Sequence, residues 1–334
     1  MAYAYTLSNK GYKMRVSVIM ITFNHEPYIR EAINGVLMQK VNFELELIIA
    51  DDCSTDNTAG IINDVLDNHA NSSIIRYTRH QTNKGMMPNF IWALQQCKGE
   101  YIALCEGDDY WTDPYKLQKQ VDFLEDNKDY AGVCTNLYLH NRKTDQRIIH
   151  NRIPNTIKYI DTNLQLQENY INTCTFLSKK EVLNFLLKHP TETTYDTTFF
   201  TYTTFLGKIG YLPEPMANYN QFVGVHHRQK KSALVELNLK ILTDIEQHAP
   251  LKITHRLFTK LSKRKLYFRA AIAYAQENNL TKAFRYYVNY LTLLPIGLAF
   301  AFSSKNVSKI TLKMKYSLLL NMLSSIKRKV FAGK

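Results

Sequence analysis

Four short apolar runs alternate with segments of helical periodicity in the first 105 residues of the chain. The runs span 16–23, 45–50, 74–77 and 101–105, and polar turn residues bound each of them. Between the runs, apolar side chains recur every three or four residues, as in helices that cover a sheet. Alternating strands and helices predict an α/β fold with a mostly parallel sheet flanked by helices. A further strand is expected at 131–139.

Polar side chains follow three of these strands. They are Asn24 and Glu26 after the first strand, Asp51 and Asp52 after the second, and Asp108 and Asp109 after the fourth. Because ligands of open α/β sheets bind outside the carboxyl ends of the strands, we expect these groups to converge on one site. Asp51 either caps a turn or contacts the ligand, and the sequence leaves both interpretations open.

The fourth run ends in Glu106-Gly107-Asp108-Asp109. Carboxylates this close repel each other unless a cation lies between them. Carboxylate oxygens suit Mn²⁺ or Mg²⁺, and such an ion can in turn hold a phosphate. A solvated acidic turn is the plainer alternative. Gly107 fits both interpretations, because glycine allows a tight turn and a close approach to a ligand.

The motifs of several other protein classes are absent from this sequence. No G-x-G-x-x-G follows the first strand, and the chain contains no G-x-x-x-x-G-K-[ST] and no G-x-S-x-G. The five cysteines form no C-x-x-C pair, which predicts neither disulfides nor a zinc site and favours a reducing cytosol. They are Cys53, Cys97, Cys105, Cys134 and Cys174. No apolar run approaches the roughly 20 residues of a membrane-spanning helix.

The positive charge of the chain is concentrated near its C-terminus. The net charge is +13, and residues 251–334 contain 17 Lys and Arg but one acidic residue. We therefore expect a polar lead-in at 1–13, an α/β domain at 14–230 and a basic helical region at 231–334. In the last region, 267–278 and 281–294 predict a helix pair, and the stretch beyond 305 is basic and amphipathic.

The basic amphipathic stretch predicts contact with an anionic membrane surface, so we expect a cytoplasmic protein peripheral to the inner face of the plasma membrane. A helical cap on the α/β domain is the alternative. Nucleic acid is not expected as a partner, because the predicted cleft is acidic and no nucleic-acid-binding module is present.

Four segments, in this order and spacing, resemble the inverting glycosyltransferases of family 2, which have the GT-A fold. The segments are VSVIMITFN at 16–24, IIADDCSTDNT at 48–58, NKG at 83–85 and EGDDYW at 106–111. The resemblance covers roughly residues 14–228. It implies a metal-dependent transfer of a sugar from a nucleotide-sugar donor, UDP-linked, to a hydroxyl of a glycan or lipid-linked acceptor in surface polysaccharide synthesis.

The resemblance also assigns roles to residues. By resemblance, Asp108 and Asp109 bind the metal, and Asp52 accepts a hydrogen bond from the uracil N–H. The residues that bind the nucleotide sugar are Thr22, Phe23, Asn24, Glu26, Asp52, Asn83, Gly85, Glu106 and Asp108. The family's first acid is Asp where this chain has Glu106, which leaves open which carboxylates contact the metal. Tyr110 and Trp111 are expected to pack rather than to react.

The second half of the domain should supply the catalytic base. In the family, an acid that opens a helix precedes a strand similar to GKIGYLP at 207–213, which points to Asp196. A simple N-cap is the alternative role of Asp196. The family often follows with a Tyr-Arg-x-His motif, but after Tyr219 this chain has neither the Arg nor the His at the usual position. His226, His227 or Arg228 is the candidate to replace them. Residues 172–188 are expected on the acceptor side.

Two other functions remain open at this point. A sugar-phosphate nucleotidyltransferase shares the sheet architecture, but it needs a glycine-rich and basic loop after the first strand, and residues 22–25 do not form one. A non-catalytic, membrane-associated scaffold with a degenerate transferase domain is the other alternative.

Overall fold

The computed structural model describes residues 14–150, 153–154, 156–191, 196–223 and 229–293. These residues form two compact units. The first contains the described residues up to 165 and from 169 to 223, and the second contains 166–168 and 229–293. Among the helices of these ranges, none combines the length and the apolar character needed to cross a bilayer.

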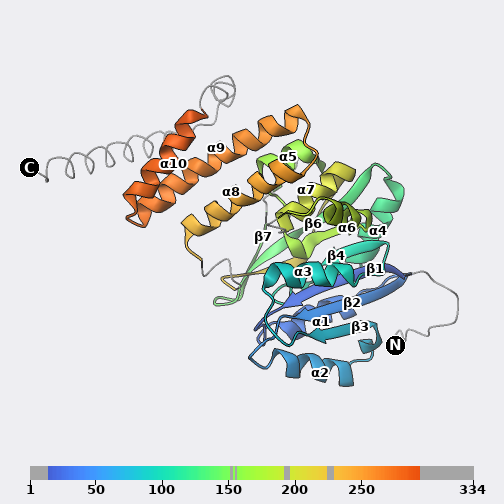
Figure 1. The fold of residues 1–334 in the computed structure, drawn as a ribbon. Coiled ribbons are helices and arrows are strands. Elements are labelled where there is room, and N and C mark those ends of the chain that lie inside the picture. Colours follow the sequence, from blue (N-terminus) through green and yellow to red (C-terminus); the bar gives the residue numbers. More distant parts are fainter. Residues whose placement is uncertain (1–13, 151–152, 155, 192–195, 224–228, 294–334) are drawn as a thin grey trace, which may run out of the picture. The chain divides into compact units, whose positions relative to one another are not determined.

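The first unit is built on a single ten-stranded sheet (Figure 1), in which eight strands follow the order β3-β2-β1-β4-β9-β6-β10-β5. The strands are β1 (Met14–Thr22), β2 (Glu44–Asp51), β3 (Ile75–Arg79), β4 (Tyr101–Leu104), β5 (Tyr110–Trp111), β6 (Tyr130–Asn141), β7 (Gln146–Ile149), β8 (Tyr159–Ile160), β9 (Phe176–Lys179) and β10 (Lys208–Gln221). The five strands predicted from the sequence are β1, β2, β3, β4 and β6.

The sheet is mixed rather than purely parallel, although most of its paired residues are in parallel pairs. Strands β1 to β4 are parallel to one another, as the alternating pattern predicted, and β6 is parallel to β10. However, β9 lies between β4 and β6 and is antiparallel to both. Strands β5, β7 and β8 are also antiparallel to their partners. The short connection from β6 to β7 explains one of these pairs, because a tight turn can join only antiparallel neighbours.

Helices connect the strands and supply the core. They are α1 (Ile29–Leu37), α2 (Thr58–Asn68), α3 (Met86–Gln95), α4 (Lys116–Asp126), α5 (Thr162–Gln167), α6 (Glu181–Lys188) and α7 (Asp196–Leu206), with the short 3₁₀ segments η1 (Ser72–Ile74) and η2 (Thr173–Thr175). The apolar faces of α1, α2 and α4 bury alternate residues of β1 and β2 in one cluster. Strand periodicity explains this alternation, since successive side chains point to opposite faces.

A lysine is buried in this unit. Lys116 is 0% exposed, its Nζ lies 4.2 Å from the centroid of the Trp111 ring, and it donates to Oε1 of Gln120 at 2.7 Å. Burial lowers the pKa of Lys116 to about 8. Gln120 donates to the carbonyl of Thr175, and Nε1 of Trp111 donates to the carbonyl of Cys174. Trp111 is therefore a packing residue, 1% exposed, that helps to fix η2.

The second unit is helical in its described part, as predicted. Its helices α8 (Lys231–His248), α9 (Ile253–Gln276) and α10 (Leu280–Thr292) pack in sequence (Figure 1). The expected helix pair corresponds to α9 and α10, where Ala271 and Ala283 are fully buried. The basic amphipathic stretch beyond 305 lies outside the described residues.

Candidate active site

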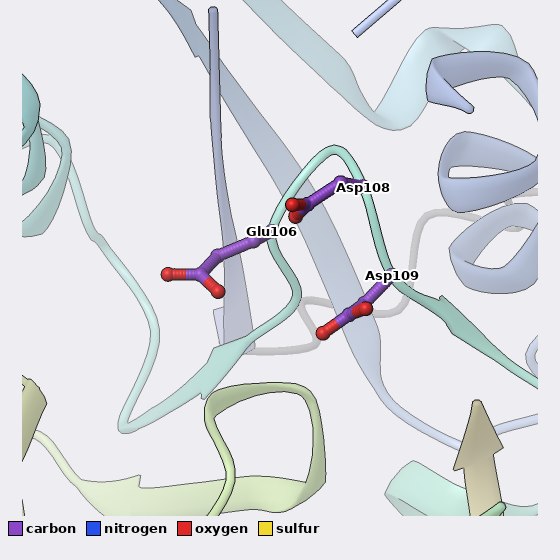
Figure 2. Close-up of side chains that lie close together, drawn as sticks. All are labelled: Glu106, Asp108 and Asp109. Atoms are coloured by element: carbon purple, nitrogen blue, oxygen red, sulfur yellow. The ribbon is translucent and has the colours of Figure 1, made fainter. Parts of the chain in front are cut away.

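Three carboxylates gather in the loop between β4 and β5. Figure 2 shows Glu106, Asp108 and Asp109 projecting from this loop toward the same side, and one carboxylate oxygen of each lies within 4.8 Å of those of the other two. The loop continues the pairing of β4 with β1, because the N–H groups of Cys105 and Gly107 donate to carbonyls of β1 at 3.0 Å. The parallel strand pair thus brings the carboxylates to the end of β1.

Gly107 is required by the close packing of this loop. A Cβ at this position would lie 2.8 Å from Oγ1 of Thr22 and 2.9 Å from Nδ1 of His25. Distances below 3.0 Å force one of the groups to move. The absence of a side chain therefore lets the acidic loop contact the first residues after β1.

Several buried polar atoms around this loop have no hydrogen-bond partner among the described residues. They are Oδ2 of Asp109, Oγ1 of Thr22 and Nδ1 of His25. By contrast, Oδ1 of Asp109 accepts from the N–H of Asn220 at 2.9 Å, and Nδ2 of Asn220 donates to the carbonyl of Asp108. A buried polar group without a partner costs about 1–3 kcal/mol, so a cluster of such groups marks a place for a ligand.

The carboxyl groups of Glu106 and Asp109 resist ionisation when no cation is present. Burial raises the pKa of Glu106 to about 8, and the negative charges of Asp108 and Asp196 act in the same direction. A hydrogen bond from Thr173 to Glu106 at 2.9 Å opposes the shift. Burial, and then the charge of Asp108, hold the pKa of Asp109 well above its usual range. The oxygen-only ligand set and the unpartnered Oδ2 atom therefore fit a hard divalent cation such as Mn²⁺ or Mg²⁺.

The loops after β1 and β2 are tied together by reciprocal hydrogen bonds. Asn24 donates its N–H to Ser54 and accepts from the N–H of Thr55 at 2.7 Å, while Glu26 donates its N–H to Asp56 and accepts from the N–H of Asn57 at 3.1 Å. Asn24 has a φ of 56°, a left-handed conformation that Asn tolerates better than most residues. The side chains of Asn24 and Glu26 thus hold the two loops in register.

Asp51 and Asp52 have different environments. Asp51 is 0% exposed and accepts from the N–H and Oγ of Ser54 and from the hydroxyl of Tyr77. Asp52 accepts from the N–H groups of Lys84 and Gly85 at 2.7 and 2.9 Å. Asp51 is therefore bonded to its own turn and to β3, whereas Asp52 draws the 83–85 segment toward the loop after β2.

The 83–85 segment completes this edge of the sheet. Gly85 has a φ of 86°, which favours glycine, and its N–H also contacts Oδ1 of Asn83. Asn83 is exposed, and the ring of Phe23 is 40% exposed. The residues assigned to the nucleotide sugar by resemblance therefore all lie at the carboxyl ends of β3, β2, β1 and β4, which are consecutive strands of the sheet. Thr22 is the last residue of β1, and the others lie in the loops that follow the strands.

Asp196 is the first residue of α7, and its Oδ1 accepts from the N–H of Thr197 at 2.6 Å. This local bond resembles a cap. Its charge nevertheless contributes to the raised pKa of Glu106, so Asp196 lies within electrostatic reach of the acidic loop. Both interpretations of Asp196 are compatible with this position.

Three residues near the cluster were not predicted from the sequence as part of the site: His25, Tyr219 and Asn220. Thr173 belongs to the segment 172–188 that was expected on the acceptor side, but its hydrogen bond to Glu106 was not predicted. Thr173 is 67 residues from Glu106 in the chain, and Asn220 is 112 residues from Asp108. Burial raises the pKa of Tyr219, and the carboxylates of Asp109, Glu106 and Asp108 raise it further. No motif or periodicity links these positions to the acidic loop. His226, His227 and Arg228 lie outside the described residues.

Comparisons with known proteins identify the family and the fold of this chain. Residues 17–186, a little over half of the chain, match the family model for glycosyl transferase family 2. An uncharacterised protein of Mycobacterium tuberculosis is 48% identical over 119 residues, which are 36% of this chain and 34% of that protein. This chain thus spans about a third of the length of that relative.

Two solved structures are similar across most of the chain. TarS 1–349 of S. aureus in complex with UDP-GlcNAc has a TM-score of 0.57 at 16% identity and covers 84% of this chain and 90% of its own. The mannosyltransferase PcManGT of Pyrobaculum calidifontis, in complex with GDP-Man and Mn²⁺, has a TM-score of 0.58 at 16% identity and covers 97% and 89%. The mixed sheet with flanking helices is a GT-A fold, and the chain belongs to glycosyl transferase family 2.

Proposed function

We propose that this chain is a metal-dependent inverting glycosyltransferase. In this proposal it moves a sugar from a nucleotide-sugar donor, UDP-linked, to a hydroxyl of a glycan or lipid-linked acceptor in surface polysaccharide synthesis. The observation that carries the proposal is the partly buried cluster of Glu106, Asp108 and Asp109, with the unpartnered oxygen of Asp109, at the carboxyl end of β4. Membership in glycosyl transferase family 2 supports it.

The donor nucleotide is proposed to lie over the ends of β1 and β2. Phe23 offers an exposed ring face to a base, Asp52 offers carboxylate lone pairs to a base N–H, and Asn83 and Gly85 line the same edge. Asn24 and Glu26 are proposed to act through the loop bonds that shape this surface. The similar structures were solved with UDP-GlcNAc and with GDP-Man, so the test must compare both nucleotides.

Asp108 and Asp109 are the proposed metal ligands, with Glu106 beside them. A bound Mn²⁺ or Mg²⁺ supplies charge stabilisation for the departing diphosphate. The protein supplies the position of the ligands: Asn220 orients Asp109 and the backbone of Asp108, and Thr173 orients Glu106. These contacts hold the carboxylates together before the ligand arrives, which lowers the cost of binding.

Asp196 is the proposed general base. Inversion requires a group that takes the proton from the acceptor hydroxyl on the face opposite the leaving diphosphate. Asp196 is the first residue of α7, and the effect of its charge on the pKa of Glu106 supports this proposal. The N–H and the hydroxyl of Thr197 both donate to Oδ1 of Asp196, which orients this carboxylate.

The backbone after β1 does not favour a nucleotidyltransferase, which grips a triphosphate with N–H groups. The N–H groups of Asn24, His25 and Glu26 already donate to Ser54, Thr58 and Asp56, at 2.9, 2.9 and 3.0 Å. No described N–H of these three residues is therefore left for a phosphate.

We propose a transferase domain at 14–230 and a basic helical region at 231–334 that contacts an anionic membrane surface. The proposed location is cytoplasmic and peripheral to the inner face of the plasma membrane, where lipid-linked acceptors are assembled.

Calorimetric titration with UDP, GDP and CMP, each with and without Mn²⁺, tests the donor site. The expected result is Mn²⁺-dependent binding of UDP that weakens at least tenfold in Asp108→Asn. Asp67→Asn is the matched control, because it removes the same charge from an exposed position on α2. Preferred binding of GDP would change the donor class, and no binding by a folded sample would contradict the proposal.

A further inference from the structure

The second unit contains a groove that the transferase site does not use. It has a volume of about 410 Å³ and lies between α8 and α10, with α9 contributing one ring. Its charged and aromatic lining consists of Glu236 and Lys240 from α8, Tyr267 from α9, and Lys282, Arg285 and Tyr286 from α10. This volume lies within the roughly 300–1,000 Å³ that is usual for ligand pockets.

One end of the groove is held by a hydrogen-bond network. The hydroxyl of Tyr286 donates to Oε1 of Glu236 at 2.7 Å, and Nζ of Lys282 lies 3.6 Å from the same oxygen. Lys282 also donates to the hydroxyl of Tyr274 at 3.1 Å, and the rings of Tyr274 and Tyr286 stack with an angle of 7° between their planes. The rings are therefore fixed before any ligand binds, which reduces the entropic cost of binding.

The lining of the groove combines aromatic surface with positive charge. The lining contains three cations, Lys240, Lys282 and Arg285, and one carboxylate, that of Glu236, so its net charge is about +2 at neutral pH. Lys240 and Arg285 are both exposed. The half-buried ring of Tyr267 lies 6.2 Å from that of Tyr286, and the two rings are tilted by 35°. Thr243 and Asn289 add an hydroxyl and an amide.

We propose that this groove binds an anionic glycan chain, whose sugar units carry carboxylate or phosphate groups. Tyrosine rings pack against the apolar faces of sugar rings, hydroxyl and amide groups bond to sugar hydroxyls, and the cations pair with the anionic substituents. The statement that this glycan is the acceptor rests on the proposed transferase function. The binding itself does not.

An acidic peptide fits the groove less well. An extended peptide is usually held by the edge of a sheet, and the described part of the second unit contains no strand. A helical peptide needs an apolar groove, but Leu239 is the single aliphatic residue of the lining. The peptide is therefore an outcome to be tested rather than the proposed ligand.

Calorimetry or ligand-observed NMR with the full chain tests the proposal. The probes are tri-galacturonate and mannopentaose phosphate as anionic glycans, maltotriose as a neutral glycan, and hexaglutamate as an acidic peptide. We expect both anionic glycans to bind, at least tenfold more tightly than maltotriose and hexaglutamate. We also expect a loss of at least tenfold in Lys240→Gln/Arg285→Gln and of at least fivefold in Tyr267→Ala.

The matched control is Lys265→Gln/Arg269→Gln, which removes two exposed cations of α9 that do not line the groove. Circular dichroism checks that every variant is folded. An equal loss in the control, equal binding of hexaglutamate, or no binding of either anionic glycan would overturn the proposal. UDP binding on the same samples separates the two proposals: glycan binding without nucleotide binding would leave the groove standing and remove its acceptor role.

Discussion

The backbone of Gly107 lies so close to Thr22 that a Cβ at position 107 would be 2.8 Å from Oγ1 of the threonine. This approach joins the acidic loop after β4 to the loop after β1. The loop after β1 is proposed to bind the base, and the acidic loop is proposed to bind the diphosphate. The relative position of these two loops therefore depends on Gly107.

Gly107→Ala should therefore damage the site more than the fold. The added methyl group must displace Thr22 or His25, at a cost of about 1–3 kcal/mol in the free energy of unfolding. We expect Mn²⁺-dependent nucleotide affinity, measured by calorimetry, to fall at least tenfold. The control is Gly60→Ala on α2, where the new Cβ meets the exposed side chain of Asn57, which can rotate away. Unchanged affinity in Gly107→Ala would show that the loop is more adaptable than its packing indicates.

Substitution of the adjacent acids Asp51 and Asp52 should separate stability from binding. Asp51→Ala leaves the buried N–H and hydroxyl partners of Ser54 and Tyr77 without an acceptor, and we expect the free energy of unfolding to fall by about 2–3 kcal/mol. Asp52→Ala should cost less, about 1 kcal/mol, but should abolish nucleotide binding. Urea unfolding and calorimetry measure the two effects. The reverse order of effects would contradict the distinction.

The raised pKa of Glu106 predicts a pH-dependent stability for the metal-free protein. Because the folded-state pKa of about 8 exceeds the ordinary value of 4.5, folding stability should fall as pH rises from about 4.5 to 8. A bound cation favours the ionised form, so Mn²⁺ should raise the melting temperature more at pH 8 than at pH 5.5 and should release protons on binding.

Thermal unfolding with and without Mn²⁺ at the two pH values checks this prediction. Glu106→Gln should reduce the pH dependence of stability in the metal-free state, and the raised pKa of Asp109 should account for what remains. An increment in melting temperature that is the same at both pH values would argue against metal binding at these carboxylates.

Asp196→Asn should distinguish the two possible roles of Asp196, general base and helix cap. The asparagine Oδ1 can still accept from the N–H of Thr197, so we expect little change in melting temperature and unchanged nucleotide affinity. Loss of a general base usually costs 10²- to 10⁴-fold in rate, and sugar transfer should fall by at least 10². Steady-state transfer assays and thermal unfolding test this. If the variant instead melts earlier and transfers at the wild-type rate, Asp196 is only a cap.

The local elements of the first unit could be predicted because each carries its own pattern. Short apolar segments of four to nine residues identified β1 to β4 and β6. The polar residues after β2 and β4 identified the edge of the sheet where Asp52 and Asp108 lie. The mixed character of the sheet could not be predicted in this way. A short apolar segment such as β9 has the same appearance whichever way it runs, and its direction depends on the neighbours it pairs with.

Strand and helix periodicity, together with the order of polar residues along the chain, was enough to determine the α/β class, the acidic loop and the helical C-terminal region. The tertiary structure alone decided that Asn220 and Thr173 orient the acidic carboxylates. It also decided that Asp51 is bonded to its own turn and to β3, and that Tyr286 closes a groove with Glu236. Most of these contacts join residues far apart in the chain, which come together only when surfaces pack, so no local pattern of residue types records them.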